Sequence, residues 1–335
     1  MLLVGRRGGV AEDLVRRAGI ELETIPISGL DLSNLRSAAG FAGRLPGGVL
    51  RSLRLIRRFG ADVVVGTAGY VSVPVVMAAR IARVPVVLLE QNALPGRATR
   101  LLAARADVVA ASFVGTASEL PRARVVHTGN PIRPEVTAMA AAAFGPRCRH
   151  VLVMGGSQGS RRLNEAVMAG LRDLLEDPQL TVTHQTGELD HLWVLRFHEA
   201  LPESMRSRYQ VAAFFVDIAA EEAAADLVVM RAGGSSLAEV AVLGRPMVLV
   251  PYPHAGGHQR FNAEPYVAAG AASSVADEEL SGTRLLAEVR RVVDDPAAWL
   301  AMAAASAAMG RPNAADQVVG LIRDVVERRQ SRSAA

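Results

Sequence analysis

The stretch from residue 226 to 263 constrains the fold more than any other part of the sequence. It contains two short apolar runs, 227–230 and 247–250, each bounded by turn-forming residues. Between them, a glycine turn at 233–234 leads into a segment with apolar residues at helical spacing, which Gly244 ends. Continuous apolar runs are typical of parallel strands buried on both faces. The stretch therefore predicts a strand–helix–strand unit of an α/β fold, with the glycine turn at the sheet edge where such folds bind ligands.

The start of this helix has the chemistry of an anion site. A helix that begins at about Ser236 leaves the backbone N–H groups of Gly234, Ser235 and Ser236 free to bind an anion, which the helix dipole also favours. Glu239 lies one turn further on. Its carboxylate repels a bare phosphate but accepts hydrogen bonds from the two hydroxyls of a ribose, so the pattern indicates a nucleotide diphosphate. Ser236-x-x-Glu239 is also a capping box, and this segment alone leaves both interpretations open.

Polar residues also follow the second apolar run. A loop rich in proline and glycine, residues 251–257, precedes His258, Gln259 and Asn262, which begin another helix. Amide side chains donate and accept hydrogen bonds at once, which suits the hydroxyls of a sugar. We expect these residues close to Glu239. The alternative is a helix-capping loop whose polar residues face water.

A second glycine loop, GGSQGS at 155–160, lies between an apolar strand at 150–154 and a helix at 161–175. Its spacing is not G-x-G-x-x-G, which argues against a dinucleotide-binding fingerprint. Ser157 and the backbone amides of the loop are suited to hold phosphate oxygens. Phe214 and Phe215 end a strand expected over 209–216, and they either pack on a nucleobase or belong to the core.

The first half of the chain also places polar residues after predicted strands. The strands are expected at 62–66 and 86–89. Tyr70 and Ser72 follow the first, and Glu90, Gln91 and Asn92 follow the second. Since the carboxyl ends of parallel strands share one edge of a sheet, these side chains are candidates to border a ligand. The alternative role for Glu90, Gln91 and Asn92 is helix capping.

Residues 45–59 are predicted to form an amphipathic helix with a basic face. Its apolar face is expected to hold Val49, Leu50, Leu53 and Ile56, and its basic face Arg51, Arg54 and Arg58. Arginines beside exposed apolar residues suit an anionic membrane surface. The alternative is a solvated arginine face on a helix that packs on the core.

Composition limits the remaining classes of function. At 335 residues the chain is long enough for two domains. The net charge is only +4 and dense basic runs are absent, so nucleic acid is not an expected partner. The single Cys148 excludes an internal disulfide framework. Arg80 and Arg83 interrupt the apolar region 71–89, so we expect no transmembrane span there.

Six motifs together carry a resemblance to a known family. RAGGSSLAEVAVLGRP (231–246) and PYPHAGGHQRFNA (251–263) resemble the donor-site signature of the MurG family, glycosyltransferase family 28. GTAGYVSVP (66–74), EQNALPGRATRLLA (90–103), GNPIR (129–133) and VMGGSQGSRRLNEAV (153–167) extend the likeness in the order typical of the family. The resemblance implies a GT-B fold, α/β with two doubly wound Rossmann-like domains facing across a cleft. It also implies inverting transfer of N-acetylglucosamine from UDP-GlcNAc to lipid I, giving lipid II in peptidoglycan synthesis.

The resemblance also assigns domains and site residues. It implies an acceptor domain over 1–134, completed by a C-terminal helix at 313–330, and a UDP-GlcNAc-binding domain over 135–312. The implied donor contacts are Asn92, Arg133, Ser157, Phe215, Gly234, Ser235, Ser236, Leu237, Ala238, Glu239 and Gln259. Tyr70, Ser72 and Gln91 are expected on the acceptor side, and Glu90 is the candidate general base. No cofactor is implied, and because a D-x-D motif is absent, no divalent ion is expected. The expected location is the cytoplasmic face of an anionic cell membrane, as a peripheral protein.

Two departures from the family bear on activity. The family precedes the strand predicted at residues 1–4 with another strand, a glycine loop that ends in histidine, and a helix, so we expect a truncated acceptor domain. Leu89 also stands where the family usually has histidine. Two rival functions stay open. One is a nucleotide-sugar epimerase or another GT-B transferase, which would turn over without the lipid acceptor. The other is a protein that binds UDP-sugar without transferring it.

Overall fold

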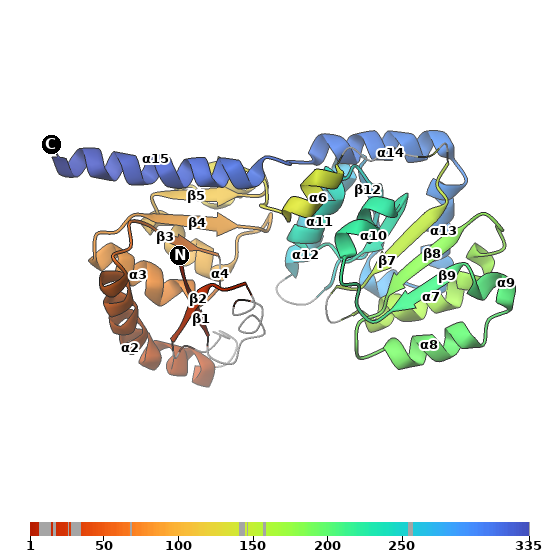
Figure 1. The fold of residues 1–335 in the computed structure, drawn as a ribbon, viewed down its shortest axis with the longest axis horizontal. Coiled ribbons are helices and arrows are strands. Elements are labelled where there is room, and N and C mark those ends of the chain that lie inside the picture. Colours follow the sequence, from red (N-terminus) through yellow and green to blue (C-terminus); the bar gives the residue numbers. More distant parts are fainter. Residues whose placement is uncertain are drawn as a thin grey trace. The chain divides into compact units, whose positions relative to one another are not determined.

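The computed structural model describes residues 1–6, 15, 18–25, 27, 35–67, 69–140, 145, 147–156, 159–253 and 257–334 (Figure 1). The chain divides into two compact units. The N-terminal unit comprises residues 1–129 with 316–335, and the C-terminal unit comprises residues 130–315. The C-terminal unit thus begins at Asn130 instead of the expected residue 135, and Arg133 belongs to it.

The C-terminal unit is built on one six-stranded parallel sheet. Its strands are β7 (His150–Met154), β8 (Thr181–Gln185), β9 (Tyr209–Ala212), β10 (Leu227–Met230), β11 (Met247–Leu249) and β12 (Ala272–Ser274). Their spatial order is β12-β11-β10-β7-β8-β9, so the chain runs outward from the centre in both directions. This is the doubly wound order, and its switch point lies between β7 and β10. Every residue of β10 is at most 1% exposed, as expected for a strand covered on both faces.

Helices follow nearly every strand of this sheet (Figure 1). The helices of this unit are α6 (Pro134–Met139), which precedes the sheet, and then α7 (Arg161–Leu174), α8 (His191–Glu199), α9 (Glu203–Arg206), α10 (Ile218–Ala224), α11 (Gly234–Val242), α12 (His258–Ala268), η3 (Asp277–Glu279), α13 (Gly282–Val293) and α14 (Pro296–Met309). Trp299 of α14 is fully buried, and its indole nitrogen donates to the carbonyl of Asp226 at 2.8 Å. That bond fixes α14 to the chain just before β10.

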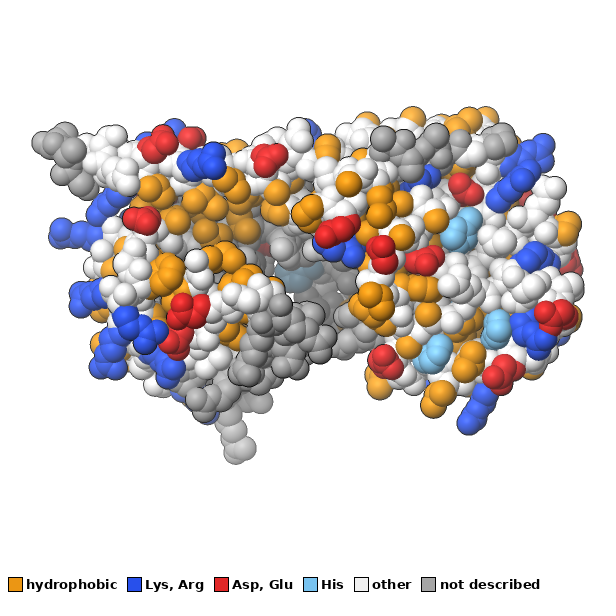
Figure 2. Space-filling view, viewed as in Figure 1, with side chains coloured by type: hydrophobic (Ala, Val, Ile, Leu, Met, Phe, Trp, Pro, Cys, Tyr) orange, Lys and Arg blue, Asp and Glu red, His pale blue; other side chains and the backbone are white. Residues whose placement is uncertain are grey.

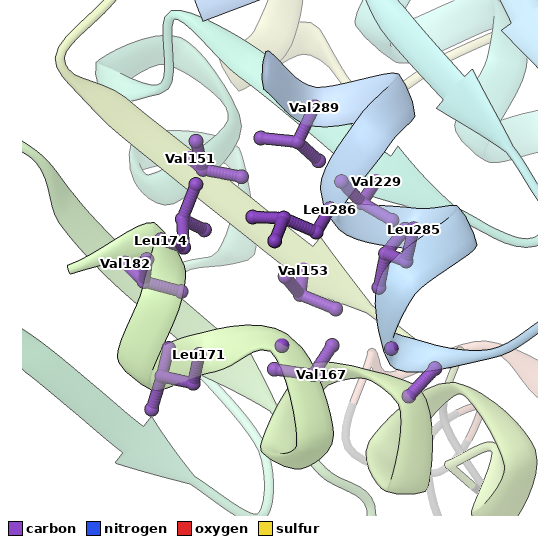
Figure 3. Close-up of a pocket in the computed structure, with 13 residues that line it drawn as sticks. Val151, Val153, Val167, Leu171, Leu174, Val182, Val229, Leu285, Leu286 and Val289 are labelled. Atoms are coloured by element: carbon purple, nitrogen blue, oxygen red, sulfur yellow. The ribbon is translucent and has the colours of Figure 1, made fainter. Parts of the chain in front are cut away.

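A small apolar cavity lies between α7, α13 and the sheet (Figure 3). Val151 and Val153 of β7 face Leu285 and Leu286 of α13 across it. Its volume of about 20 Å³ leaves room for little more than one water molecule. Because its lining is apolar, the cavity is expected to stay dry. It is a packing gap in the core and is unsuited to a nucleotide.

The N-terminal unit contains two parallel sheets among its described residues. β1 (Leu2–Arg6) pairs with β2 (Glu21–Ile25), and a four-stranded sheet joins β3 (Val64–Gly66), β4 (Val86–Glu90), β5 (Val108–Ala111) and β6 (Val125–His127) in that order. The helices are α2 (Leu35–Phe59), α3 (Ser72–Ile81), α4 (Arg97–Leu102), η1 (Ala103–Arg105), α5 (Thr116–Glu119) and α15 (Ala314–Ala334). Val325 of α15 packs on Val87 and Val108, so the C-terminal helix belongs to this sheet.

Helix α2 is longer than the predicted 45–59. The assignment of Leu50 to its apolar face is wrong. The buried positions include Phe41, Ser52, Leu55 and Ile56, at helical spacing. Leu50 falls off this stripe and is 48% exposed. Arginine side chains gather on the side of the unit where α2 lies (Figure 2). None of the helices in the described part of the chain has a segment long and apolar enough to span a bilayer.

Candidate functional site

The glycine loop after β7 and the turn after β10 meet at the switch point of the C-terminal sheet, because their strands are neighbours. Within the glycine loop, Gly155 has no room for a side chain, since a Cβ there would lie 2.6 Å from the backbone nitrogen of Ser160. Gly156 and Gly159 have φ values of +86° and +79°, which other residues rarely adopt. A Cβ on Gly159 would also lie 2.3 Å from the carbonyl oxygen of Thr186. The loop therefore requires these glycines. Ser157, an expected donor contact, lies outside the described residues.

Arg231 fixes the end of that loop, a role the sequence analysis did not foresee. Its Nε and Nη2 donate to the Ser160 hydroxyl at 3.0 and 2.7 Å. Its Nη1 donates to the carbonyl of Val250 at 3.0 Å and to the carboxylate of Asp277. Ser160 is the N-cap of α7, yet its side chain makes no cap hydrogen bond to the helix. Since the hydroxyl oxygen is occupied by Arg231, the first N–H groups of α7 stay available to an anion.

Helix α11 begins earlier than predicted and without a side-chain cap. Its N-cap is Gly233 and its first residue is Gly234. Ser236 is therefore the third residue of the helix and cannot be its N-cap, so the capping-box interpretation of Ser236 and Glu239 is wrong. The N–H groups of Gly234, Ser235 and Ser236 lie in the first turn, where backbone amides lack partners within the helix. The side-chain amide of Asn262 donates to the carbonyl of Ala232 at 3.2 Å and supports this turn.

Glu239 forms a two-bonded ion pair with Arg133. The Arg133 Nε donates to Oε1 at 2.7 Å and Nη2 donates to Oε2 at 3.0 Å. The Glu239 side chain is 10% exposed and that of Arg133 is 40% exposed. The hydrogen bond to Glu239 holds the pKa of the Arg133 guanidinium above its usual value. Arg133 and Glu239 were both expected at the donor site, but the ion pair between them was not expected.

Asn130 is a further site residue that sequence reasoning missed. Its Nδ2 approaches the Ser235 hydroxyl of α11 at 3.4 Å, and its Oδ1 is buried without a partner among the described residues. It follows Gly129, whose φ is +81°. Gly129 adopts the left-handed backbone conformation and turns the chain here. The glycine of the GNPIR motif is the sequence feature that could have pointed to Asn130.

The other expected donor residues of this unit differ in how far their side chains are exposed. Leu237 is fully buried, so only its backbone can face a ligand. Ala238 is partly exposed, and Phe215 is only 9% exposed, so little of the Phe215 side chain is open to a ligand. The strand expected to reach residue 216 ends at Ala212, so Phe214 and Phe215 lie in the following loop. The Gln259 Oε1 accepts from the backbone nitrogen of Tyr252 at 2.9 Å, which leaves Nε2 as the donor of this amide.

In the N-terminal unit, Glu90 is 1% exposed and holds the loop that follows it. Its Oε1 accepts from the backbone nitrogen of Asn92 at 3.0 Å and from Asn92 Nδ2 at 3.2 Å. Its Oε2 accepts from the backbone nitrogen of Gly96 at 3.0 Å. A general base must reach the proton that it abstracts. These contacts give Glu90 a positioning role, and Asn92 is the residue it positions. Gln91, between them, is exposed.

The expected acceptor residues Tyr70 and Ser72 lie where α3 begins. The Tyr70 ring packs edge-on against Phe41 of α2, with ring centroids 6.0 Å apart. Ser72 is the first residue of α3, and its backbone nitrogen donates to the carbonyl of Gly69 at 2.9 Å. A Cβ on Gly66 would lie 2.8 Å from the Leu88 side chain of the neighbouring strand β4, so this glycine leaves room for that side chain. Within the described ranges, no group of three or more His, Cys, Asp or Glu side chains could hold a metal ion.

Comparison with known proteins places this geometry in a family. Residues 3–111 match the glycosyltransferase family 28 N-terminal domain, and residues 150–318 match the C-terminal domain of the same family. A relative from Desulforudis audaxviator is 39% identical over 335 residues, with 96% of this chain and 89% of that protein covered. One from Moorella thermoacetica is 39% identical, with 98% and 91% covered. Both are named UDP-N-acetylglucosamine--N-acetylmuramyl-(pentapeptide) pyrophosphoryl-undecaprenol N-acetylglucosamine transferase.

Solved structures agree with this assignment. The crystal structure of Acinetobacter baumannii MurG has a TM-score of 0.76 and 26% identity, covering 96% of this chain and 90% of that one. A UDP-N-acetylglucosamine 2-epimerase from Listeria monocytogenes has a TM-score of 0.66 at 14% identity, which shows a shared fold only. The fold is thus GT-B, with two Rossmann-like α/β units, the architecture of a class of nucleotide-sugar-dependent glycosyltransferases. The chain belongs to glycosyltransferase family 28.

Proposed function

We propose that this protein transfers N-acetylglucosamine from UDP-GlcNAc to lipid I, the undecaprenyl-pyrophosphoryl-linked N-acetylmuramyl pentapeptide, and so forms lipid II for peptidoglycan. One observation carries the proposal: relatives named for this reaction are 39% identical to the chain over nearly all of its length. The match spans both family domains, so it includes the acceptor-side half of the chain.

The donor would bind at the switch point of the C-terminal sheet. Its diphosphate meets the first turns of α7 and α11, which lack side-chain caps and carry partial positive charge. Its ribose hydroxyls donate to Glu239. Each oxygen of that carboxylate accepts one bond from Arg133 and retains a second acceptor site. Arg133 therefore orients Glu239 without occupying it fully.

Arg133 would also touch the donor directly. Its Nε and Nη2 face carboxylates, and within the described part of the chain Nη1 makes no hydrogen bond. With a side chain 40% exposed, Nη1 offers two N–H groups to an oxygen of the ligand. Gln259 would offer its Nε2 to the sugar, because Tyr252 occupies its oxygen.

The chemistry then follows from these placements. An acceptor hydroxyl gives up its proton to a general base and attacks the anomeric carbon, the bond to the UDP oxygen breaks, and the configuration inverts. The leaving diphosphate gains negative charge, which helix N-termini and a guanidinium stabilise more in the transition state than in the ground state. Glu90 remains the candidate base from sequence, but its bonds to Asn92 and Gly96 favour a positioning role.

The same proposal places the protein at the cytoplasmic face of an anionic membrane, where its lipid acceptor resides. Helix α2 supports this placement, because Leu50 is 48% exposed on a helix that also carries exposed arginines. Arg51 and Arg58 contact Glu23 of β2, whereas Arg44, Arg54 and Arg57 of that helix are exposed and make no ion pair among the described residues, so these three have most charge to offer a lipid surface.

The test is an assay with purified protein, UDP-GlcNAc labelled in the sugar, and lipid I. Transfer predicts labelled lipid II with a β-glycosidic bond, and release of UDP only when lipid I is present. An epimerase would instead convert UDP-GlcNAc without lipid I. A binding protein would retain UDP-GlcNAc and yield neither product. Either of these results would overturn the proposed function.

A further inference from the structure

A second carboxyl group lies against Arg133, and the proposed function does not use it. Glu222 of α10 is only 2% exposed, and its Oε2 lies 3.4 Å from Arg133 Nη2. Buried carboxyl groups are rare unless they are paired. The residue at 222 is therefore a buried acid at the edge of the donor site.

The guanidinium of Arg133 contacts two carboxyl groups, and its hydrogen bonds to them differ in number and length. Glu239 takes two short bonds, from Nε and Nη2, whereas Glu222 receives one long contact from the same Nη2. A single positive charge therefore faces two carboxyl groups, and Glu239 holds the shorter contacts with it. An ionised Glu222 would add an unmatched negative charge to a buried cluster.

The elements around α10 offer Glu222 little compensation. An apolar cluster of Val136, Ala219, Val242 and Leu243 packs at the contact of α6, α10 and α11. The other titratable or charged groups on these elements and on β7 are Glu135, His150, Asp217, Glu221 and Arg245.

Three of those groups bind backbone, and Glu135 adds a further negative charge near Arg133. Asp217 caps the start of α10 by accepting from the nitrogen of Ala220. Arg245 donates to the carbonyl of Ala223, and His150 contacts the carbonyl of Ala224. Burial, together with the negative charge of Glu239, raises the pKa of Glu222 to about 8 against the opposing effect of Arg133.

We propose that Glu222 is a positioning residue whose protonation controls donor binding: as a neutral acid it leaves Arg133 on Glu239, and as an anion it draws Arg133 away and repels the diphosphate. The inference rests on the proposed function of the site as a UDP-sugar site. Ionisation of Glu222 would then lower the affinity for the donor as pH rises above neutrality.

The size of the effect follows from linkage. A site that binds its ligand only with Glu222 protonated loses affinity about tenfold for each pH unit above the pKa of the free protein. Between pH 7 and pH 9, the dissociation constant for UDP should therefore rise about tenfold. Conversely, bound UDP should cause proton uptake by the protein near pH 8.

The experiment is calorimetric titration of the full chain with UDP from pH 6.5 to 9. Glu222→Gln mimics the neutral acid, and it should match the wild type at pH 6.5 and lose the fall in affinity at pH 9. Glu222→Asp keeps a titrating carboxyl group and should retain a fall. The matched control is Glu221→Gln, the same change of charge one residue away on α10, which should behave as the wild type. Titration of UDP itself is common to all four proteins and cancels in the comparison.

Equal pH profiles for Glu222→Gln and the wild type would overturn the inference. Absence of UDP binding in the wild type at pH 6.5 would instead overturn the proposed function, so the two failures are distinguishable. If Glu222→Gln does not fold, infrared spectroscopy of the wild type decides. A protonated-carboxyl band that disappears as pH passes 8 supports the inference, and its absence at pH 6.5 contradicts it.

Discussion

Arg133 and Glu239 are 106 residues apart in the chain, yet Nε and Nη2 of the arginine meet Oε1 and Oε2 of the glutamate at 2.7 and 3.0 Å. Arg133 is the N-cap of α6 and Glu239 lies in α11. The pair therefore joins the segment that enters the C-terminal unit to the helix whose first turn forms part of the proposed diphosphate site. This geometry fixes the plane of both side chains, as bidentate arginine–carboxylate pairs do.

Glu239→Ala should weaken binding of UDP and of UDP-GlcNAc by about ten- to a hundred-fold, because a charge-assisted hydrogen bond to the ribose contributes about 1.5–3 kcal/mol. Calorimetric titration measures the loss. Glu264→Ala is the control, since Glu264 is exposed and its one ion pair among the described residues is with Arg260. Unchanged affinity in Glu239→Ala would place the ribose elsewhere and leave the carboxylate with a structural role only.

Gly159→Ala should abolish donor binding and also destabilise the C-terminal unit. The φ of +79° strains any side chain, and the new Cβ would meet the carbonyl of Thr186 at 2.3 Å. Gly270→Ala is a matched control, because Gly270 has a φ of +76° but nothing within 4 Å of its Cβ position. The control should lose only the about 1–2 kcal/mol of left-handed strain and keep its affinity for UDP. Equal losses of affinity in both variants would mean that the glycine loop is not part of the site.

Glu90→Gln should lower the melting temperature of the N-terminal unit. The Glu90 oxygens accept from three N–H donors of Asn92 and Gly96, and an amide NH₂ would oppose at least one of them. An unmet buried donor costs about 1–3 kcal/mol. Differential scanning calorimetry measures the change, with the exposed Glu119→Gln as control. If Glu90 is instead only the general base, the variant keeps its melting temperature and loses turnover with intact UDP binding.

The stability of the protein should depend on the protonation of Glu222. Its pKa is about 8 in the folded chain against 4.5 for the free side chain, so between these values the unfolded state releases a proton that the folded state holds. The contribution of Glu222 to stability is complete below pH 4.5 and is lost as pH rises to 8, at up to about 1.4 kcal/mol per pH unit. Glu222→Gln lacks this loss. Its melting temperature should therefore rise relative to the wild type between pH 5.5 and pH 8, and a constant difference would contradict the assignment.

Leu50→Glu combined with Arg54→Glu should reduce binding to vesicles that contain anionic phospholipid. Leu50 is exposed on α2, and Arg54 is an exposed arginine outside the pairs with Glu23. Co-sedimentation measures binding, which should weaken as salt is raised. Arg260→Glu, on an 81% exposed side chain of the C-terminal unit, should leave binding unchanged. Vesicle binding that survives the double substitution would remove α2 from the membrane proposal.

Several strands of this fold were predictable because they have a local signal, whereas β2 and β12 were not among the predicted strands. Buried parallel strands are continuous apolar runs, and β10 matches its predicted run residue for residue. The start of α11 was placed two residues late, because its N-cap is Gly233, which has no capping side chain to mark it. Leu50 was assigned to the wrong face because the predicted helix began ten residues after the observed one, which hid the stripe that includes Phe41.

The pairings within the site had no local signal. Arg133 with Glu239, and Arg231 with Ser160, join segments that are adjacent only after the sheet forms. Their residue types indicated polar chemistry at strand ends, but any of several carboxylates could have paired with either arginine. Glu222 carried no signal in the sequence, because burial of one acid on a short helix depends on what packs against it.

A crystal structure of the protein with UDP-GlcNAc tests the account of the donor site most directly. The account predicts the diphosphate against the first turns of α7 and α11, and the ribose hydroxyls within hydrogen-bond distance of Glu239 while Arg133 keeps its two bonds to that carboxylate. The amide of Gln259 should lie beside the sugar. A nucleotide bound away from the β7–β10 switch point, or a ribose turned away from Glu239, would contradict it.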